Sequence, residues 1–156
     1  MNRQRLTLFA AILISFVAGG LAGGAVAFWK IGLESGEALV LATLANSGNE
    51  AYVRYRYGSY GVAKAALLRH AELVERSGAG ARVLGNGGAA LELGLTYGRL
   101  AEAAQRAGLT EESSKYMRLA CEAFERRGQP VGDSQVRASV AKLDVAWDTR
   151  LAGPAE

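Results

Sequence analysis

Few of the residue types that build catalytic or metal centres occur in this chain of 156 residues. It contains one cysteine, Cys121, one histidine, His70, and only two prolines. A single cysteine cannot close an internal disulfide, and a single histidine excludes a metal site built from several histidines. Nothing in the sequence brings His70 and Cys121 together as a base and a nucleophile. We therefore expect no catalytic residues, no metal and no cofactor, and we expect Cys121 to be buried.

Charge is missing from one long stretch near the start of the chain. Residues 6–29 contain no charged side chain and follow directly behind Arg3 and Arg5. At about 1.5 Å per residue, a helix of this length exceeds the roughly 30 Å hydrocarbon core of a bilayer. We predict a short flank at residues 1–5, a transmembrane helix at 6–29, a domain at 30–151 and a flexible tail at 152–156.

The basic flank predicts the orientation of this anchor. The positive-inside rule places residues 1–5 in the cytoplasm and residues 30–156 across the membrane. For a bacterial-type cell, this predicts an inner-membrane protein with one span, in contact with lipid, and a periplasmic domain. The alternative is a secreted protein cleaved after Ala27, because residues 25–27 fit the small-x-small cleavage pattern. The apolar stretch exceeds the usual signal core of about 7–15 residues, which favours an uncleaved anchor.

Small side chains recur along the predicted span at steps of four residues. Residues at this spacing share one helix face, and helix pairing in lipid depends on close packing of such faces. The stripe predicts a homo-oligomer, although an alanine- and glycine-rich composition alone also produces such a pattern. The residues predicted to pack are Ser15, Gly19, Gly20, Gly23, Gly24 and Ala27.

The remaining domain is almost free of net charge. The formal net charge of the whole chain is +3, and two of these charges precede the anchor. A nearly neutral domain argues against a nucleic-acid partner. Alanine, leucine, glutamate and arginine dominate the domain, which favours helices. No segment alternates apolar and polar residues as a strand does. The predicted fold class is therefore all-α.

Apolar residues at steps of three and four predict the individual helices. Gly108 and Gly128 stand where helices are expected to stop, and Thr110 is expected to be an N-cap. The predicted helices are 34–46, 50–57, 62–76, 89–107, 111–127 and 134–151. We expect a break or a bend at residues 47–49 and a flexible, glycine-rich loop at 77–88, with a short turn at 81–84.

The predicted hairpin at residues 89–128 resembles a tetratricopeptide (TPR) repeat. The resemblance is carried by Leu100, Ala101, Ala104, Gly108, Ser113, Met117 and Ala120. In that family, small residues lie where the two helices cross and a glycine ends the first helix. Residues 50–77 resemble a second hairpin more loosely. The resemblance implies a small TPR-like domain with residues 134–151 as a capping helix; a generic helical bundle is the alternative.

Such arrays need about three repeats to bury a continuous face, and this chain offers at most two. We therefore expect another chain to complete part of an apolar face. Tyrosine and arginine, which are enriched at interface hot spots, gather between residues 52 and 60. On a helix these tyrosines spread over a wide arc, so they cannot all be core. Alternatively, two tyrosines pack inward and the others lie beside the membrane. The predicted partner-binding residues are Tyr52, Arg54, Tyr55, Arg56, Tyr57 and Tyr60.

Together these observations predict a membrane-anchored protein–protein interaction module without enzymatic activity. It would be a scaffold or an accessory subunit of an envelope complex, and its protein partners would be other subunits of that complex. The alternatives are a small structural membrane subunit that associates with itself and, after cleavage, a secreted helical protein.

Overall fold

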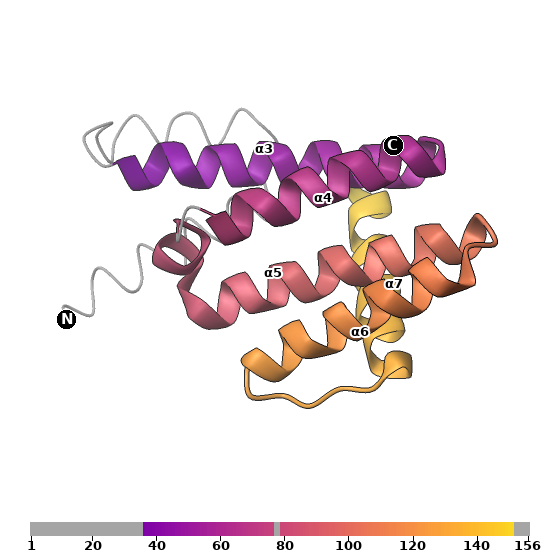
Figure 1. Ribbon diagram of the computed structural model, residues 1–156. Helices are drawn as coiled ribbons and strands as arrows, with labels where there is room; N and C mark the ends of the chain where they lie inside the picture. The colour runs from indigo at the N-terminus through magenta and orange to yellow at the C-terminus, as the bar shows by residue number, and fades with distance from the viewer. Residues whose placement is uncertain (1–35, 77–78, 152–156) are drawn as a thin grey trace. The chain divides into compact units, whose positions relative to one another are not determined.

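The computed structural model describes residues 36–76 and 79–151, and these residues contain helices and no strands. The helices are α3 (Gly36–Tyr57), α4 (Tyr60–Arg76), α5 (Ala79–Arg106), α6 (Thr110–Arg126) and α7 (Asp133–Leu151) (Figure 1). For this part of the chain, the all-α prediction is confirmed. The predicted span at 6–29, with its packing residues, and the predicted tail at 152–156 lie outside the described residues. Within those residues, no helix has the length and apolar character needed to cross a bilayer.

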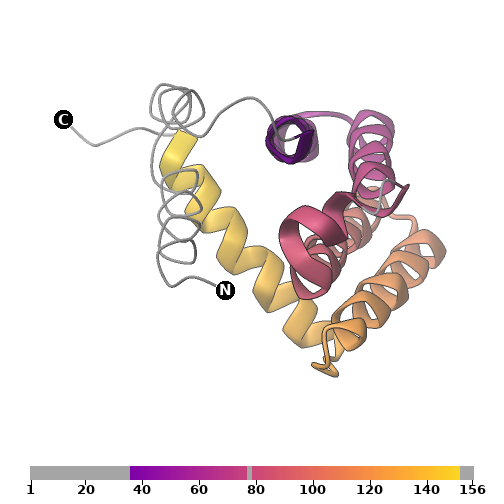
Figure 2. The ribbon, with the colours of Figure 1, turned by 90° about the vertical axis from the view of Figure 1, so that its left-hand side faces the viewer.

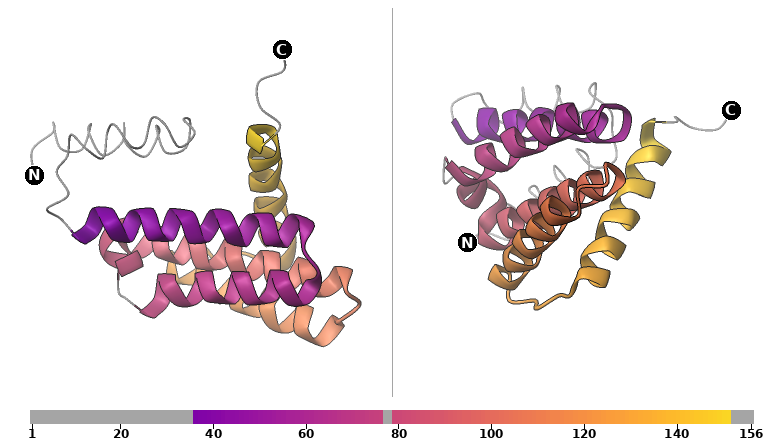
Figure 3. Two further views of the ribbon diagram at one scale, coloured as in Figure 1. Left: turned by 90° about the horizontal axis from the view of Figure 1, so that it is seen from above. Right: turned by 45° about the vertical axis from the view of Figure 1, so that its right-hand side comes forward.

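The chain divides into two compact units, residues 1–39 and residues 40–156. Of the first unit, the structure describes residues 36–39, which belong to α3. The second unit contains the rest of α3 together with α4 to α7. Within the second unit, α7 runs across α5 and α6 instead of alongside them (Figures 2 and 3).

Helix α5 is the centre of the second unit, because it packs against α4, α6 and α7. Two glycines allow this close approach. A Cβ atom on Gly94 would lie 2.7 Å from the ring of Phe124 on α6. A Cβ atom on Gly98 would lie 2.7 Å from a methyl group of Val140 on α7. Packing at native density leaves no room for either atom, so glycine sets the distance between these helices.

The crossing of α5 and α6 lies where the sequence pattern places it. Leu100, Ala101, Ala104 and Ala120 are fully buried, and Met117 is nearly so. Helix α6 is amphipathic, and its buried positions recur at helical spacing. These positions are Ser113, Tyr116, Met117, Ala120, Ala123 and Phe124. The packing of this hairpin agrees with the predicted register, while its assignment as a TPR repeat stays a prediction.

Of the break or bend predicted at residues 47–49, the break is wrong, because α3 continues through these residues to Tyr57. The physical reason is a close approach between helices. A Cβ atom on Gly48 would lie 3.2 Å from the imidazole of His70 on α4, and the Ser47 hydroxyl is 3.2 Å from the same ring. Gly48 therefore makes room for a neighbouring side chain and does not end the helix.

The predicted loop at residues 77–88 is also wrong from residue 79 onward, where α5 begins. The helix is kinked at Gly85, whose φ of 73° is a left-handed conformation that glycine adopts without strain. Leu84 is half-buried against the cluster that contains Ala89 and Leu93. Tertiary packing of this kind stabilises helix where glycine-rich sequence alone does not.

Gly108 and Gly128 end α5 and α6 as predicted, with φ values of 75° and 81°. After α5, the Leu109 N–H donates to the Ala104 carbonyl at 2.9 Å, which closes a Schellman motif. Thr110 is the first residue of α6, so its predicted capping role is wrong. The cap residue is Leu109, without a side-chain cap bond, and its carbonyl accepts the N–H of Ser113 at 2.9 Å.

Candidate interaction site between α3 and α4

The predicted partner-binding residues divide between the core and the surface. Tyr52 and Tyr55 on α3 are almost completely buried, and Tyr60 at the start of α4 is half-buried. Tyr57, at the end of α3, is 73% exposed. Two tyrosines therefore pack inward, as one of the interpretations of the sequence proposed.

Tyr52 belongs to a buried polar network that joins α3 to α7. Its hydroxyl donates to the Asp148 carboxylate at 2.8 Å and lies 3.1 Å from the Asp144 carbonyl oxygen. Its ring stacks on Trp147 with the centroids 5.2 Å apart. Burial, followed by the hydrogen bond to Asp148, raises the pKa of Tyr52 well above its usual value. The phenol therefore stays neutral and serves as a structural donor.

An ion pair between Arg99 of α5 and Asp144 of α7 completes this network. Nε and Nη2 of Arg99 lie 3.0 and 2.9 Å from Oδ1 of Asp144, and both side chains are at most 10% exposed. The guanidinium also lies over the Tyr52 ring, 4.8 Å from its centroid. Sequence reasoning missed this pair. The available signal was register, because Asp144 follows Val136 and Val140 at steps of four residues.

Tyr55 is held by charged groups of α5. The guanidinium of Arg106 lies over its ring at 4.5 Å, and Nη2 of Arg106 donates to the Tyr55 carbonyl at 3.3 Å. Burial, together with the negative charge of Asp144, raises the pKa of Tyr55 to about 12. Tyr55 thus fixes α3 against α5 and offers no surface to a partner.

Two further members of the predicted set also have partners within the domain. The Tyr60 hydroxyl and the Lys64 ammonium both donate to the carboxylate of Glu112 on α6. Arg56 donates to the carboxylate of Asp148 on α7. Tyr60 and Arg56 therefore help to hold the helices together, although Arg56 stays on the surface.

Arg54 and Tyr57 are exposed like Arg56, but they differ from it in their contacts. Among the described residues, neither side chain has an ion-pair or hydrogen-bond partner. They are three residues apart, so they lie next to each other on one side of α3. Val53 and Val62, exposed by 38% and 43%, lie on the same helical hairpin. Arginine, tyrosine and aliphatic side chains are thus available for an intermolecular contact.

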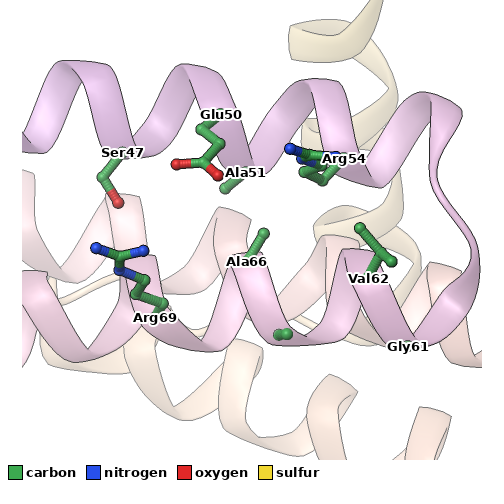
Figure 4. A pocket seen from close by; sticks show the side chains of 9 residues that line it. Ser47, Glu50, Ala51, Arg54, Gly61, Val62, Ala66 and Arg69 are labelled. Atoms are coloured by element: carbon green, nitrogen blue, oxygen red, sulfur yellow. The ribbon is translucent and has the colours of Figure 1, made fainter.

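A groove with a volume of about 380 Å³ lies between α3 and α4, and Arg54 and Val62 are among the residues that line it (Figure 4). Arg54 comes from the α3 wall and Arg69 from the α4 wall, and both are exposed. Within the described part of the chain, Arg69 also lacks a hydrogen-bond or ion-pair partner. The other lining residues are Ser47, Glu50 and Ala51 of α3 and Gly61, Val62, Ala65 and Ala66 of α4.

Next to the groove, Ser47, His70 and Glu92 connect α3, α4 and α5. Nδ1 of His70 lies 3.2 Å from the Ser47 hydroxyl, and Nε2 lies 2.9 Å from the Glu92 carboxylate. The order of groups is that of a hydrolytic relay. However, Ser47 lies in the interior of α3, where neighbouring backbone N–H groups are used in the helix and none is positioned for an oxyanion. The imidazole is 3% exposed and both of its nitrogens have partners, so His70 is a satisfied core residue.

The contact with His70 lowers the pKa of Glu92. Burial alone would raise the pKa of the Glu92 carboxyl, but the hydrogen bond and charge of His70 lower it overall. Cys121, which was expected to be buried, is only half-buried against the core. Its sulfur lies 3.8 Å from the Asp133 carboxylate, and burial raises the pKa of this thiol. Across the described residues, no group of three or more His, Cys, Asp and Glu side chains is arranged to hold a metal ion.

Comparison with known proteins gives no match to a family model, to a curated protein or to a solved structure. Function is therefore inferred from the residues of this chain and their geometry.

Proposed function

We propose that this protein is a membrane-anchored interaction module that binds a protein partner with the exposed side of its α3–α4 hairpin. The observation that carries the proposal is the groove between these helices, which Arg54 lines, with the exposed Tyr57 three residues farther along α3. Arginine and tyrosine are enriched among the residues that dominate interface energies. The buried Tyr52 and Tyr55 hold this surface in place from below.

The anchor in this proposal is the uncharged stretch at residues 6–29. Its length suits a bilayer, and the basic flank before it favours a cytoplasmic N-terminus. We place the protein in a bacterial-type inner membrane with residues 30–156 in the periplasm. The helical domain, TPR-like in its α5–α6 hairpin, would serve as a scaffold or an accessory subunit of a membrane complex.

The test is co-purification of the full chain with its partner from mild detergent, with identification by mass spectrometry. Tyr57→Ala should reduce recovery of the specific partner at least fivefold, because it removes an exposed aromatic anchor. Val145→Ala on α7 is the matched control, since Val145 is 66% exposed and lies on another helix. Equal recovery with both variants would contradict the proposed surface.

Self-association through the predicted span is the second candidate function, and the repeated small residues at positions 15–27 favour it. Gly19→Leu combined with Gly23→Leu would place large side chains on that face and should abolish dimers in a membrane association assay. Dimers that persist in this variant would exclude the glycine stripe as the contact.

A further inference from the structure

We infer that the α3–α4 groove binds a peptide segment of the partner that carries an Asp or Glu carboxylate beside an apolar side chain. This inference rests on the proposed function and specifies the chemistry that the partner brings. It follows from the charges on the two walls of the groove, from the side chains between them and from the shape of the site.

The groove holds two cations whose hydrogen-bond donors are unused within the described residues. Arg54 and Arg69 line it from opposite helices and have no carboxylate partner there (Figure 4). The neighbouring cations differ, because Arg56 pairs with Asp148 and Lys64 pairs with Glu112. A guanidinium presents a planar set of donors that matches a carboxylate in two-point contact. The two free arginines are thus suited to an acidic side chain lying between the helices.

Glu50 limits how much negative charge the groove accepts. Its carboxylate also points into the groove, between the positions of Ser47 and Arg54 along α3 (Figure 4). Two arginines and one glutamate leave a net charge of about one positive unit. A single carboxylate complements this charge, whereas a polyanion would meet repulsion from Glu50.

Apart from Ser47, the remaining lining is small and apolar. Ala51, Ala65 and Ala66 leave space between the helices, and Val62 is 43% exposed at the same site. A volume of about 380 Å³ lies within the roughly 300–1,000 Å³ that is common for ligand sites. This combination fits an acidic residue followed or preceded by an apolar one. A bilayer surface is broad and flat, so it would not enter a concavity of this size.

The experiment is a selection of random twelve-residue peptides, displayed on phage, against the full chain in mild detergent. Selected peptides should be enriched in Asp or Glu next to apolar residues. A synthetic peptide of the selected sequence should bind more weakly at higher salt, because exposed charges are screened. Replacing its acidic residues with the corresponding amides should weaken binding roughly tenfold.

Two double variants of the protein complete the test. Arg54→Gln with Arg69→Gln should weaken binding of the selected peptide roughly tenfold or more. Arg118→Gln with Lys142→Gln removes the same charge from exposed positions on α6 and α7 and should change the affinity less than twofold. Far-ultraviolet circular dichroism should be the same for all three proteins, since each substituted side chain is exposed.

Selected peptides without acidic enrichment, or equal affinity in the two double variants, would overturn the inference. Binding to phosphatidylserine vesicles that requires Arg54 and Arg69, in the absence of selected peptides, would overturn it in favour of a lipid headgroup. If partner recovery depends on Tyr57 but the groove shows no acidic preference, this inference fails while the proposed function stands.

Discussion

The two helical hairpins of the domain differ in how completely they close. In α5–α6, glycine and alanine bring the helices into tight contact, and Gly94 accepts the ring of Phe124 directly. In α3–α4, small residues also line the interface, yet a groove remains, and its two arginines have no carboxylate partner among residues 36–76 and 79–151. Small side chains therefore produce a tight crossing only where a large side chain from the partner helix fills the space.

Helix α3 is held by side-chain contacts to three other helices, α4, α5 and α7. Tyr52 reaches α7, Tyr55 meets α5, and Ser47 touches His70 deeper in the domain. These contacts fix the position of α3 while its outer side stays open. One helix thus separates a structural face from a face that is available for binding.

The largest effect is expected from breaking the buried Arg99–Asp144 pair. Asp144→Ala leaves the Arg99 guanidinium buried without a counter-charge, which should cost about 3–5 kcal/mol of folding free energy. A urea titration followed by circular dichroism measures this loss. Replacing both residues with apolar ones, as Arg99→Met with Asp144→Leu, should recover most of it. A loss below about 1 kcal/mol in the single variant would show that the pair does not hold α7 in place.

A direct contrast between the two faces of α3 is given by Tyr55→Ala and Tyr57→Ala. The first removes a buried aromatic ring and should lower the free energy of unfolding by about 3–5 kcal/mol. The second removes an exposed ring and should change it by less than about 0.5 kcal/mol. Thermal unfolding monitored by circular dichroism compares them. Similar losses in both variants would mean that the two faces are not separated.

The role of glycine is tested by Gly98→Ala and Gly61→Ala. A Cβ atom at residue 98 collides with Val140, so overpacking should cost about 1–3 kcal/mol. A Cβ atom at residue 61 meets nothing within 4 Å, so the better helix propensity of alanine should stabilise α4 by up to about 1 kcal/mol. The two changes in unfolding midpoint should therefore have opposite signs. A stabilising Gly98→Ala would contradict the close approach of α5 and α7.

The smallest effect concerns the dependence of stability on pH at Glu92. Because its folded-state pKa is lowered, Glu92 contributes full stability above its unfolded pKa of about 4.3. That contribution is lost as pH falls from about 4.3 through the lower folded pKa. The Glu92 side chain is 36% exposed, so solvent screening keeps the effect below about 1 kcal/mol. Unfolding titrations between pH 3 and 6 should show a shallower acid loss in Glu92→Gln than in the unaltered chain.

Sequence periodicity predicted α6 and α7 well, because each helix buries one regular stripe. The sequence also predicted the stop at Gly108, because a glycine in a left-handed conformation ends the helix there. It failed at Gly48 and at residues 79–88, where the effect of glycine depends on what packs against it. A glycine beside His70 is structural, and only the arrangement of α3, α4 and α5 reveals this.

The residue types of the candidate site could be predicted from the sequence, but the burial of each side chain could not. Tyrosine and arginine marked residues 52–60 as unusual, but the sequence did not say which side chains face the core. The burial of Tyr52 depends on Arg99 and Asp144, which lie far along the chain. Arg69 was not among the predicted residues, because it comes to line the groove only when α4 folds beside α3.

Photo-crosslinking in cells tests directly whether the open face of the α3–α4 hairpin contacts a protein partner. Benzoylphenylalanine placed at Tyr57 or Val62 should form a crosslink to a second protein, because these positions border the open face of the α3–α4 hairpin. The same group at Lys142, exposed on α7, should form none. A crosslink from residue 142 without any from residue 57 or 62 would show that the partner does not bind the α3–α4 hairpin.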